Sequence, residues 1–382
     1  MRDKFLVFSA HKIEQPEIDE VVAVLKSGWL GTGPKTRQFE ENFAAYKGVS
    51  YSAALNSCTA GLHLACIALD LKLGDEIITT PMTFSATINT IIHSGGIPVL
   101  ADIDPYTLNI DPKEIEKKIT PNTRGIIPVH FAGRACDMNA IMAIARKHNL
   151  AVIEDCAHAI ETEYKGRKAG TFGDFGVFSF YATKNVVTGE GGMVISSSQE
   201  RINHIKMLSL HGMNFHAWQR FSDTAYKHYR IQAAGFKYNM MDLQAAIGIH
   251  QLQRVEKNWL RRQEIWNRYI EAFDKLMIGL PAPIEINSRH AYHLFQLLLD
   301  RDKIGISRDS FLNAMAVQKI GLGVHYLSIC EYPYYQQKFG WKPTDYPQAF
   351  KIGQQTVSLP ISSSLTDEDV QDVIDAVKKV LS

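Results

Sequence analysis

The sequence contains few cysteines, and none of them is arranged for a disulfide framework or a zinc site. The five cysteines are odd in number and include no C-x-x-C pair: Cys58, Cys66, Cys136, Cys156 and Cys330. Small disulfide-rich domains and structural zinc sites depend on closely spaced cysteine pairs. We therefore expect no disulfide, no metal site and a reducing environment, which indicates a cytoplasmic protein.

Long hydrophobic runs and an excess of one charge are also missing. The N-terminal segment FLVFSA is too short for the core of a signal peptide, and no later stretch resembles a membrane span. The formal net charge is +1, which argues against a general nucleic-acid or anionic-membrane surface. We find no internal repeat and no low-complexity tract. A local anion site remains compatible with this charge.

The length and the pattern of apolar runs predict two domains of the α/β class. The 382 residues exceed one ordinary core, and the 46% apolar and 21% charged content is that of a globular protein. Between residues 50 and 195, short apolar runs alternate with helix-like segments. This alternation predicts a mostly parallel sheet covered by helices on both faces. We expect a large domain over residues 1–278 and a smaller C-terminal α/β domain over residues 279–382.

Three local patterns refine this prediction. FGVFSF and GGMVISS, which lie within residues 175–197, are too close together to hold a crossover helix. LAVIED is followed by a short predicted helix around Cys156. From about residue 242, one long helical stretch, DLQAAIGIHQLQRVEKNWLRRQEIWNRYIEAFDKL, is predicted to link the two domains.

Polar residues follow several of the predicted strands, where an open parallel sheet binds its ligands. After SAALN, the hydroxyls and amides around Cys58, Thr59 and Ala60 suit a phosphate, although an ordinary helix N-cap also explains them. After LAVI, the carboxylate of Asp155 either orients a protonated ring nitrogen or caps the next helix. After EIITT, Phe84 either stacks on a flat ligand or packs in the core.

Lys184 follows the apolar segment FGVFSFYAT, with Ser179 just before it. A lysine held near apolar strand ends loses hydration, which lowers its pKa and makes the neutral amine available for bonding to an aldehyde. Considered alone, the segment is better explained by a lysine that reaches out to solvent. Together with a phosphate seat, an aromatic face and a carboxylate, it completes the set that pyridoxal phosphate requires.

One segment approximates a different nucleotide-binding motif. GWLGTGPKT (residues 28–36) is similar to the phosphate loop G-x-x-x-x-G-K-[ST], but Pro34 stands between Gly33 and Lys35. The preceding PEIDEVVAVLKSG reads as a helix that ends at Gly28, whereas the phosphate loop follows a strand. We therefore reject a nucleotide triphosphatase and keep this loop as a candidate rim of the active site.

The sequence resembles the DegT/DnrJ/StrS family of nucleotide-sugar aminotransferases, which are pyridoxal-phosphate enzymes of fold type I. The resemblance runs from about residue 10 to the C-terminus. It is carried, in the order expected for the family, by GWLGTGPKTRQFE, NSCTAGLHLA, GDEIITTPMTFSATIN, PVHFAGRACDM, VIEDCAHAIETEYKGRKAGTFGDFGVFSF, SFYATKNVVTGEGGMV, LSLHGMNFHAWQRF, GFKYNMMDLQAAIGIHQL and GVHY.

The resemblance implies a role for each matching residue. Lys184 would bond to the aldehyde of pyridoxal 5'-phosphate and shuttle the proton, and Asp155 would pair with its pyridine nitrogen. Further cofactor contacts are implied for Cys58, Thr59, Ala60, Phe84, His158, Ser179 and for Asn239, which the other subunit of a homodimer would donate. Tyr181 and His325 would approach the nucleotide sugar.

The implied reaction moves an amino group from an amino acid, glutamate by family habit, to C4 of a UDP-4-keto sugar in polysaccharide or lipopolysaccharide synthesis. The subgroup most similar to this chain makes 4-amino-4-deoxy-arabinose, although Tyr181 stands where that subgroup more often has histidine. A related dehydratase branch replaces the lysine by histidine, so Lys184 favours transamination. Two alternatives stay open: a pyridoxal-phosphate enzyme of the same fold acting on small amino acids, and a non-catalytic regulatory or binding member.

Overall fold

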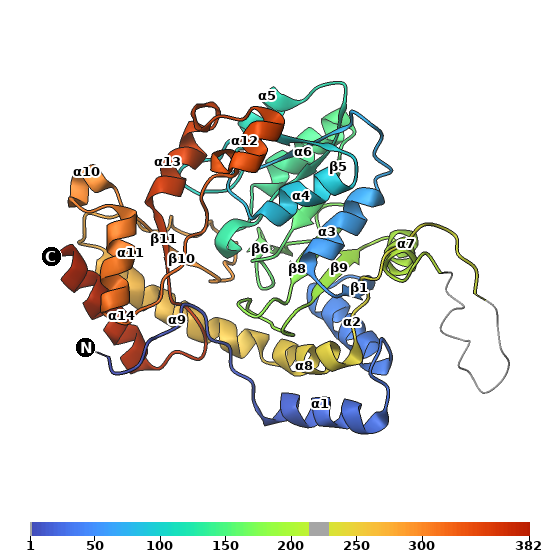
Figure 1. Cartoon of the computed structure of the whole chain (residues 1–382), viewed down its shortest axis with the longest axis horizontal. Helices are drawn as coiled ribbons and strands as arrows, with labels where there is room; N and C mark the ends of the chain where they lie inside the picture. Colours follow the sequence, from blue (N-terminus) through green and yellow to red (C-terminus); the bar gives the residue numbers. More distant parts are fainter. Residues whose placement is uncertain (1, 214–228) are drawn as a thin grey trace.

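The computed structural model describes residues 2–213 and 229–382, with a seven-stranded sheet at its centre (Figure 1). The strand order is β1-β9-β8-β5-β4-β2-β3. These strands are β1 (Tyr51–Leu55), β2 (Glu76–Thr79), β3 (Ile97–Leu100), β4 (Thr123–Ile127), β5 (Ala151–Asp155), β8 (Phe175–Ser179) and β9 (Gly192–Ser196). The predicted α/β fold with a mostly parallel sheet is confirmed.

Strand β9 runs antiparallel to both of its neighbours, β1 and β8, and every other strand pair in this sheet is parallel. Gly192 lies opposite Ser179 on one side and Leu55 on the other. The prediction that no crossover helix separates FGVFSF from GGMVISS is therefore confirmed. Because the six parallel strands end at one edge, the residues that follow them are brought together there.

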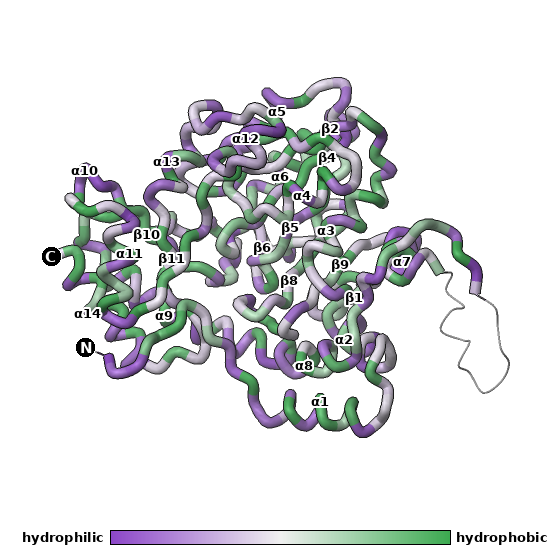
Figure 2. The backbone as a smooth tube through the Cα atoms, in the orientation of Figure 1, coloured by the Kyte–Doolittle hydropathy of each residue, from purple (hydrophilic) through white to green (hydrophobic). Residues whose placement is uncertain are grey.

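Helices cover both faces of the central sheet. Buried side chains of α3 (Cys58–Ile67), α4 (Ser85–His93) and α7 (Gln199–Ser209) pack on one face. The opposite face is covered by α2 (Pro34–Lys47), α5 (Pro112–Lys118), α6 (Met138–His148) and α8 (Asp242–Gln253). A sheet buried on both faces needs strands that are apolar throughout. Figure 2 shows green stretches of hydrophobic residues within the inner strands.

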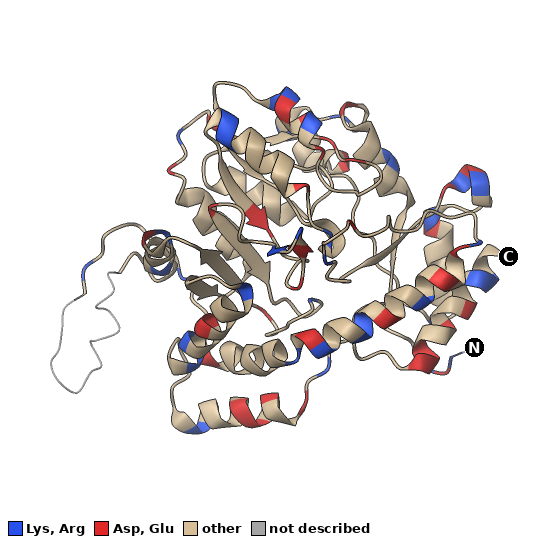
Figure 3. Cartoon of the chain, turned by 180° about the vertical axis from the view of Figure 1, so that it is seen from behind, with Lys and Arg blue, Asp and Glu red and all other residues tan. Residues whose placement is uncertain are grey.

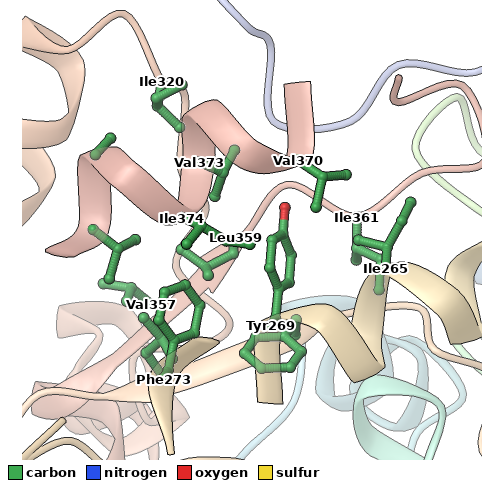
Figure 4. Close-up of a cluster of buried hydrophobic side chains, with 14 of the residues drawn as sticks. Ile265, Tyr269, Phe273, Ile320, Val357, Leu359, Ile361, Val370, Val373 and Ile374 are labelled. Atoms are coloured by element: carbon green, nitrogen blue, oxygen red, sulfur yellow. The ribbon is translucent and has the colours of Figure 1, made fainter. Parts of the chain in front are cut away.

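A second hydrophobic core is formed around a two-stranded antiparallel sheet (Figure 4). The hydroxyl of Tyr269, from the middle of this core, donates to the Pro360 carbonyl at 2.8 Å. The core is built from α9 (Val255–Phe273), β10 (Phe295–Leu298), α11 (Arg308–Val317), β11 (Thr356–Leu359) and α14 (Asp367–Leu381). A boundary near residue 279 stays a prediction.

Shorter elements complete the described chain. They are α1 (Gln15–Ser27), the 3-10 helices η1 (Phe131–Gly133), η3 (Ile329–Glu331) and η4 (Pro343–Asp345), the strands β6 (Glu163–Tyr164) and β7 (Arg167–Lys168), α10 (Arg301–Ile304), α12 (Pro333–Phe339) and α13 (Pro347–Gln355).

The N-terminal segment is fastened to the second core. Leu6 forms a parallel bridge to Ile320, and Arg2 forms ion pairs with Asp369 at 2.7 Å and Asp372 at 2.6 Å. Figure 1 shows the two ends of the chain on the same side of the molecule.

Two predictions of local structure are wrong. The long helical stretch is divided into α8 and α9 at Arg254, whose backbone leaves the helical region (φ −98°, ψ 1°) while its guanidinium pairs with Glu17 of α1. No helix forms around Cys156. The Cys156 amide donates to the Val177 carbonyl at 2.8 Å, and the Asp155 carboxylate takes the next amide, so the chain leaves the sheet in an extended form and a turn.

The surface charges are mixed rather than separated. Figure 3 shows Lys and Arg interspersed with Asp and Glu along the outer helices, as the net charge of +1 leads one to expect. Within the described ranges, no helix combines the length and the apolar character of a membrane span.

Candidate active site

Lys184 lies on a tight loop between β8 and β9, at the edge where the parallel strands end. The loop is closed by backbone bonds: Phe180 donates to Gly191 at 2.9 Å, Thr188 to Phe180 at 2.9 Å, and Lys184 to Tyr181 at 2.8 Å. Gly189 has a φ of +81°, in the left-handed region that favours glycine. The GEGG segment therefore turns the chain sharply back into β9.

The start of α3 forms a candidate anion seat. The Ser57 hydroxyl caps the helix by accepting from the Ala60 amide at 3.1 Å, so the N-cap interpretation holds for this pair. The amides of Cys58 and Thr59 have no hydrogen-bond acceptor among the residues that the structure describes. Amides at a helix start favour an anion. Burial raises the pKa of the Cys58 thiol well above its usual value, so the thiol is neutral.

Ser179 is brought to the same seat by Gly192. A Cβ atom on Gly192 would lie 2.5 Å from the amide nitrogen of Cys58 and 2.6 Å from the Ser57 carbonyl oxygen. Only glycine permits this approach, and the partner of Gly192 in β8 is Ser179. The buried Ser179 hydroxyl accepts from the Tyr181 amide at 3.3 Å.

Asp155 is a buried carboxylate at the end of β5. One oxygen accepts from the Thr87 hydroxyl at 2.9 Å and the other from the Ala157 amide at 3.1 Å. Burial raises the pKa of Asp155, while these two donors and the positive charge of Lys184 oppose the rise. Asp155 has no direct ion pair with another described residue. Its carboxylate is therefore available to pair with a protonated group of a ligand.

The side chain of Lys184 is half-buried. Burial lowers its pKa to about 8, although the neighbouring carboxylate of Asp155 favours the charged form. Lys47 shows that a lowered pKa alone does not identify a reactive lysine. Burial also lowers its pKa to about 8, but its amine donates to the Ile160 carbonyl at 3.0 Å beneath the Phe178 ring.

Neutral histidines surround Lys184. The rings of His158 and His293 are tilted to each other with centroids 4.5 Å apart, and the His325 ring lies 6.5 Å from His158. Burial, and then the charge of Lys184, hold the pKa of His158 and of His293 far below the usual value and lower that of His325 to about 3. All three rings are therefore uncharged at neutral pH.

The hydrogen bonds of His158 fix the position of its proton. Its Nδ1 accepts from the Ala132 amide at 3.2 Å, so the proton of the neutral ring is on Nε2. Nε2 lies 3.1 Å from the hydroxyl of Tyr326, whose ring stacks on His158 at 6.1 Å. The ring of Phe84 is 60% exposed and lies 6.2 Å from that of Tyr326. An exposed aromatic face at this edge suits a planar ligand and excludes the core interpretation of Phe84.

The side chain of Asn185 connects the loop that carries Lys184 to the rest of the site. Its side-chain amide donates to Glu161 at 2.9 Å and to the Ala291 carbonyl at 3.0 Å, and its oxygen lies 2.9 Å from Nδ1 of His293. Because that oxygen accepts, Nδ1 of His293 carries the proton. Glu161 in turn pairs with the buried Arg262 of α9. Helix α9 is thus connected through Glu161 to Asn185, the residue that follows Lys184.

The remaining predicted residues lie around this centre. His325 bonds through Nδ1 to the Ser358 hydroxyl at 2.9 Å, and Tyr181 is 46% exposed beside Lys184. Asn239 bridges Leu55 at the outer edge of β1, and its amide donates to the Thr32 hydroxyl at 2.6 Å. Its contribution to a second subunit stays a prediction.

The GWLGTGPKT loop does not leave a helix N-terminus open for a phosphate. The Asp242 carboxylate accepts from the amides of Gly33 at 2.7 Å, Lys35 at 3.0 Å and Thr36 at 2.9 Å. This carboxylate caps α2, so the structure agrees with our rejection of a phosphate-loop enzyme.

Glu154 has a structural role beside Asp155. Its carboxylate accepts from the amides of Gly170 and Phe172 at 2.7 Å and of Gly173 at 2.8 Å, and it lies 3.0 Å from the ring of His130. Although His130, Glu154 and Cys156 lie close enough together to be considered as metal ligands, these bonds already occupy the carboxylate.

Four residues of the site escaped the sequence analysis: Thr87, Asn185, His293 and Tyr326. Asn185 directly follows Lys184, and Tyr326 follows His325 in GVHY. Their positions next to predicted site residues were the signal that could have identified them. His293 lies in HAYHLF, which reads as the start of an apolar strand.

Comparisons with known proteins agree with this geometry. The sequence profile of the DegT/DnrJ/EryC1/StrS aminotransferase family matches residues 11–378. SpsC of Bacillus subtilis (strain 168), named a spore coat polysaccharide biosynthesis protein, is 48% identical over 382 residues, which are 100% of this chain and 98% of SpsC.

Two solved structures have the same fold over nearly their whole length. Spr1654 of Streptococcus pneumoniae, named as a proposed sugar aminotransferase and solved in its PLP form, has a TM-score of 0.92 and 32% identity, covering 99% of this chain and 98% of that one. DesI, solved in the presence of its TDP-sugar product, has a TM-score of 0.89 and 28% identity, covering 100% and 94%. This chain belongs to the DegT/DnrJ/EryC1/StrS family and is a sugar aminotransferase that depends on pyridoxal 5'-phosphate.

Proposed function

We propose that this enzyme transfers an amino group from L-glutamate to carbon 4 of a UDP-linked 4-keto sugar, in the cytoplasm, for a surface polysaccharide. The observation that carries the proposal is the juxtaposition of Lys184 with the buried carboxylate of Asp155 and the open amides of α3. The sugar class is supported by the TDP-sugar product in whose presence DesI was solved and by the polysaccharide in the name of SpsC.

The residues of the site fit pyridoxal phosphate. Asp155 is a buried carboxylate without a direct cationic partner among the described residues, as a protonated pyridine nitrogen requires. Gly192 keeps the α3 amides and Ser179 close enough together for one phosphate, and Phe84 offers an exposed ring for stacking. When bound, the cofactor supplies an aldehyde that bonds to amines and a protonated ring that withdraws electrons.

The chain's own groups then move protons between substrate atoms. The neutral amine of Lys184 takes the proton from the α carbon of the amino donor, and in the second half-reaction it returns a proton to the sugar carbon that acquires nitrogen. Asp155 holds the proton on the ring nitrogen. The three histidines beside Lys184 are uncharged. They therefore do not repel the proton that the amine of Lys184 accepts. Asn185 keeps the lysine loop in place.

The substrate assignment is tested with a panel of nucleotide-linked 4-keto and 3-keto sugars added to enzyme that has been converted to its amino form with glutamate. We expect a 4-amino sugar from a UDP-linked 4-keto substrate, at least about a hundredfold faster than from 3-keto sugars. Mass spectrometry and NMR identify the product. Turnover of amino-acid and keto-acid pairs without any nucleotide sugar would instead support the small-substrate alternative. Failure of glutamate to change the cofactor's absorption would support a non-catalytic member.

We also propose that the active form is a homodimer in which Asn239 reaches the partner's cofactor phosphate. Asn239 is half-buried at the edge of β1, next to the strand end that carries the α3 seat. The test mixes Lys184→Ala and Asn239→Ala variants at limiting cofactor. If the sites are shared, random reassembly restores up to about a quarter of the wild-type activity, because half of the dimers are hybrids with one intact site. No recovery, although hybrids form, would contradict sharing.

Substitution of Gly192 is expected to weaken cofactor binding. In Gly192→Ala the new Cβ would overlap the backbone of Ser57 and Cys58, which forces the α3 N-terminus away from β9. We expect the affinity for pyridoxal phosphate to fall at least about tenfold and the melting temperature to decrease. Gly31→Ala is the matched control, since nothing lies within 4 Å of its Cβ position. Unchanged affinity in Gly192→Ala would show that the close approach is not needed.

The lowered pKa of Lys184 predicts how cofactor addition depends on pH. The folded-state value of about 8 lies below the usual lysine value of 10.5, so the neutral amine is lost as pH falls below 8. The rate at which pyridoxal phosphate bonds to cofactor-free protein should rise about tenfold per pH unit up to pH 8 and then level off. Visible absorption after rapid mixing measures this rate. A rise that continued to pH 10 would mean that the amine is hydrated like a surface lysine.

A further inference from the structure

A second pocket, separate from the candidate active site, lies between the large sheet and the second core. It has a volume of about 220 Å³. Its walls come from three parts of the chain, residues 105–108, residues 131–134 and residues 280–298. Pockets between two packed units are common sites for small ligands.

The pocket combines an apolar interior with buried polar groups. Phe131, Leu108, Leu280 and Leu298 form its apolar lining. Gln296 is only 4% exposed, and its Nε2 has no hydrogen-bond partner among the residues that the structure describes. Buried amides are almost always hydrogen-bonded, so this one indicates that a partner enters from the pocket.

Two further groups make the pocket rich in donors. The buried His290 accepts at Nδ1 from the Tyr292 amide at 2.8 Å, so its neutral ring carries the proton on Nε2. Arg134 forms an ion pair with Glu285 at 2.6 Å and donates to the carbonyls of Pro283 at 3.0 Å and of Ala282, which fixes the guanidinium at the wall. No acidic side chain is among the described residues that line the pocket.

The backbone around this pocket is also unusual. Leu108 and Ala132, which both line it, have φ values of +64° and +59° in the left-handed region. Non-glycine residues adopt this region rarely, and strained positions concentrate at ligand sites. Ala132 and Phe131 also form the wall toward the active site, because the Ala132 amide bonds to His158. The two cavities are therefore separated by a single layer of residues.

We propose that this pocket is a second ligand site, which binds a small carboxylate with an apolar body about the size of one aromatic ring. The carboxylate would accept from Gln296 and His290 beside the Arg134–Glu285 ion pair, and the ring would contact Phe131 and the leucines. This inference does not depend on the identity of the sugar substrate.

The probe for the test is benzoate, titrated calorimetrically into the pyridoxal-phosphate-loaded enzyme. We expect one benzoate per chain, with benzyl alcohol, which has the ring but no charge, binding at least about tenfold more weakly. Gln296→Leu, which keeps the size of the side chain, should weaken benzoate binding at least about tenfold. The surface variant Gln371→Leu is the control and should bind normally.

Further variants separate this pocket from the active site. Lys184→Ala should bind benzoate as the wild type does, whereas Ala282→Phe, which fills the pocket from its half-buried rim, should abolish binding and covers the case that Gln296→Leu does not fold. The proposal is overturned if benzoate does not bind, if benzyl alcohol binds equally well, if the folded Gln296→Leu or Ala282→Phe variants keep full affinity, or if Lys184→Ala loses it.

Discussion

Lys184→Ala is expected to lose at least about a thousandfold in the rate of amino transfer and to show no visible absorption from lysine-bound cofactor. Two functions disappear together in this variant, since the amine both bonds to the cofactor and moves the proton. Treatment with borohydride, which fixes a lysine-bound cofactor to the protein, should leave the variant unlabelled. Absorption spectra, borohydride labelling and single-turnover rates with glutamate measure the three effects.

Lys47 provides the matched control for this prediction. It has a similarly lowered pKa of about 8 and is buried, but its amine is committed to the Ile160 carbonyl. Lys47→Met should therefore keep the lysine-bound cofactor and change mainly the stability of the fold. If Lys184→Ala still bonded the cofactor reducibly, the reactive amine would have to be another lysine.

Asp155→Asn is expected to lower kcat/KM for both half-reactions by at least about a hundredfold, because an amide does not hold the proton on the ring nitrogen. Without that proton the ring withdraws electrons poorly from the carbon that loses its hydrogen. The buried position strengthens the effect, since water does not replace the lost charge. Half-reaction rates with glutamate and with a keto sugar, followed by the cofactor's absorption, measure the loss.

A substitution of Thr87 tests the Asp155 carboxylate with a smaller change than Asp155→Asn. Thr87→Val removes one hydrogen bond to Asp155 and keeps its charge and the shape of the neighbouring side chain. We expect a loss of only about tenfold, corresponding to one hydrogen bond to a charged group. Equal losses in the two variants would indicate that Asp155 acts through local structure and not through its charge.

The sheet was predictable from the sequence because burial on both faces leaves strands that are apolar throughout. Spacing also predicted that no crossover helix separates β8 from β9, since too few residues lie between them. The break at Arg254 was not predictable in the same way. No proline or glycine marks it, and the guanidinium of Arg254 pairs there with Glu17, which lies far away in the sequence.

The same distinction explains which site residues were found. Asp155, Ser179 and Lys184 lie at or just after strand ends, where the sheet geometry itself directs side chains to the ligand edge. His293 and Tyr326 come from segments that reach the site only after the second core has packed against the first. Local patterns carry no information about such long-range packing.

The fastening of the N-terminal segment to the second core has a consequence for synthesis of the chain on the ribosome. Leu6 pairs with Ile320, Arg2 with Asp369 and Asp372, and the Ala10 carbonyl accepts from the hydroxyl of Ser364 at 2.9 Å. The first residues to leave the ribosome therefore form these contacts only after their partners, more than 300 positions later in the sequence, have been translated. The central sheet, whose strands all lie between residues 51 and 196, can assemble well before this final closure.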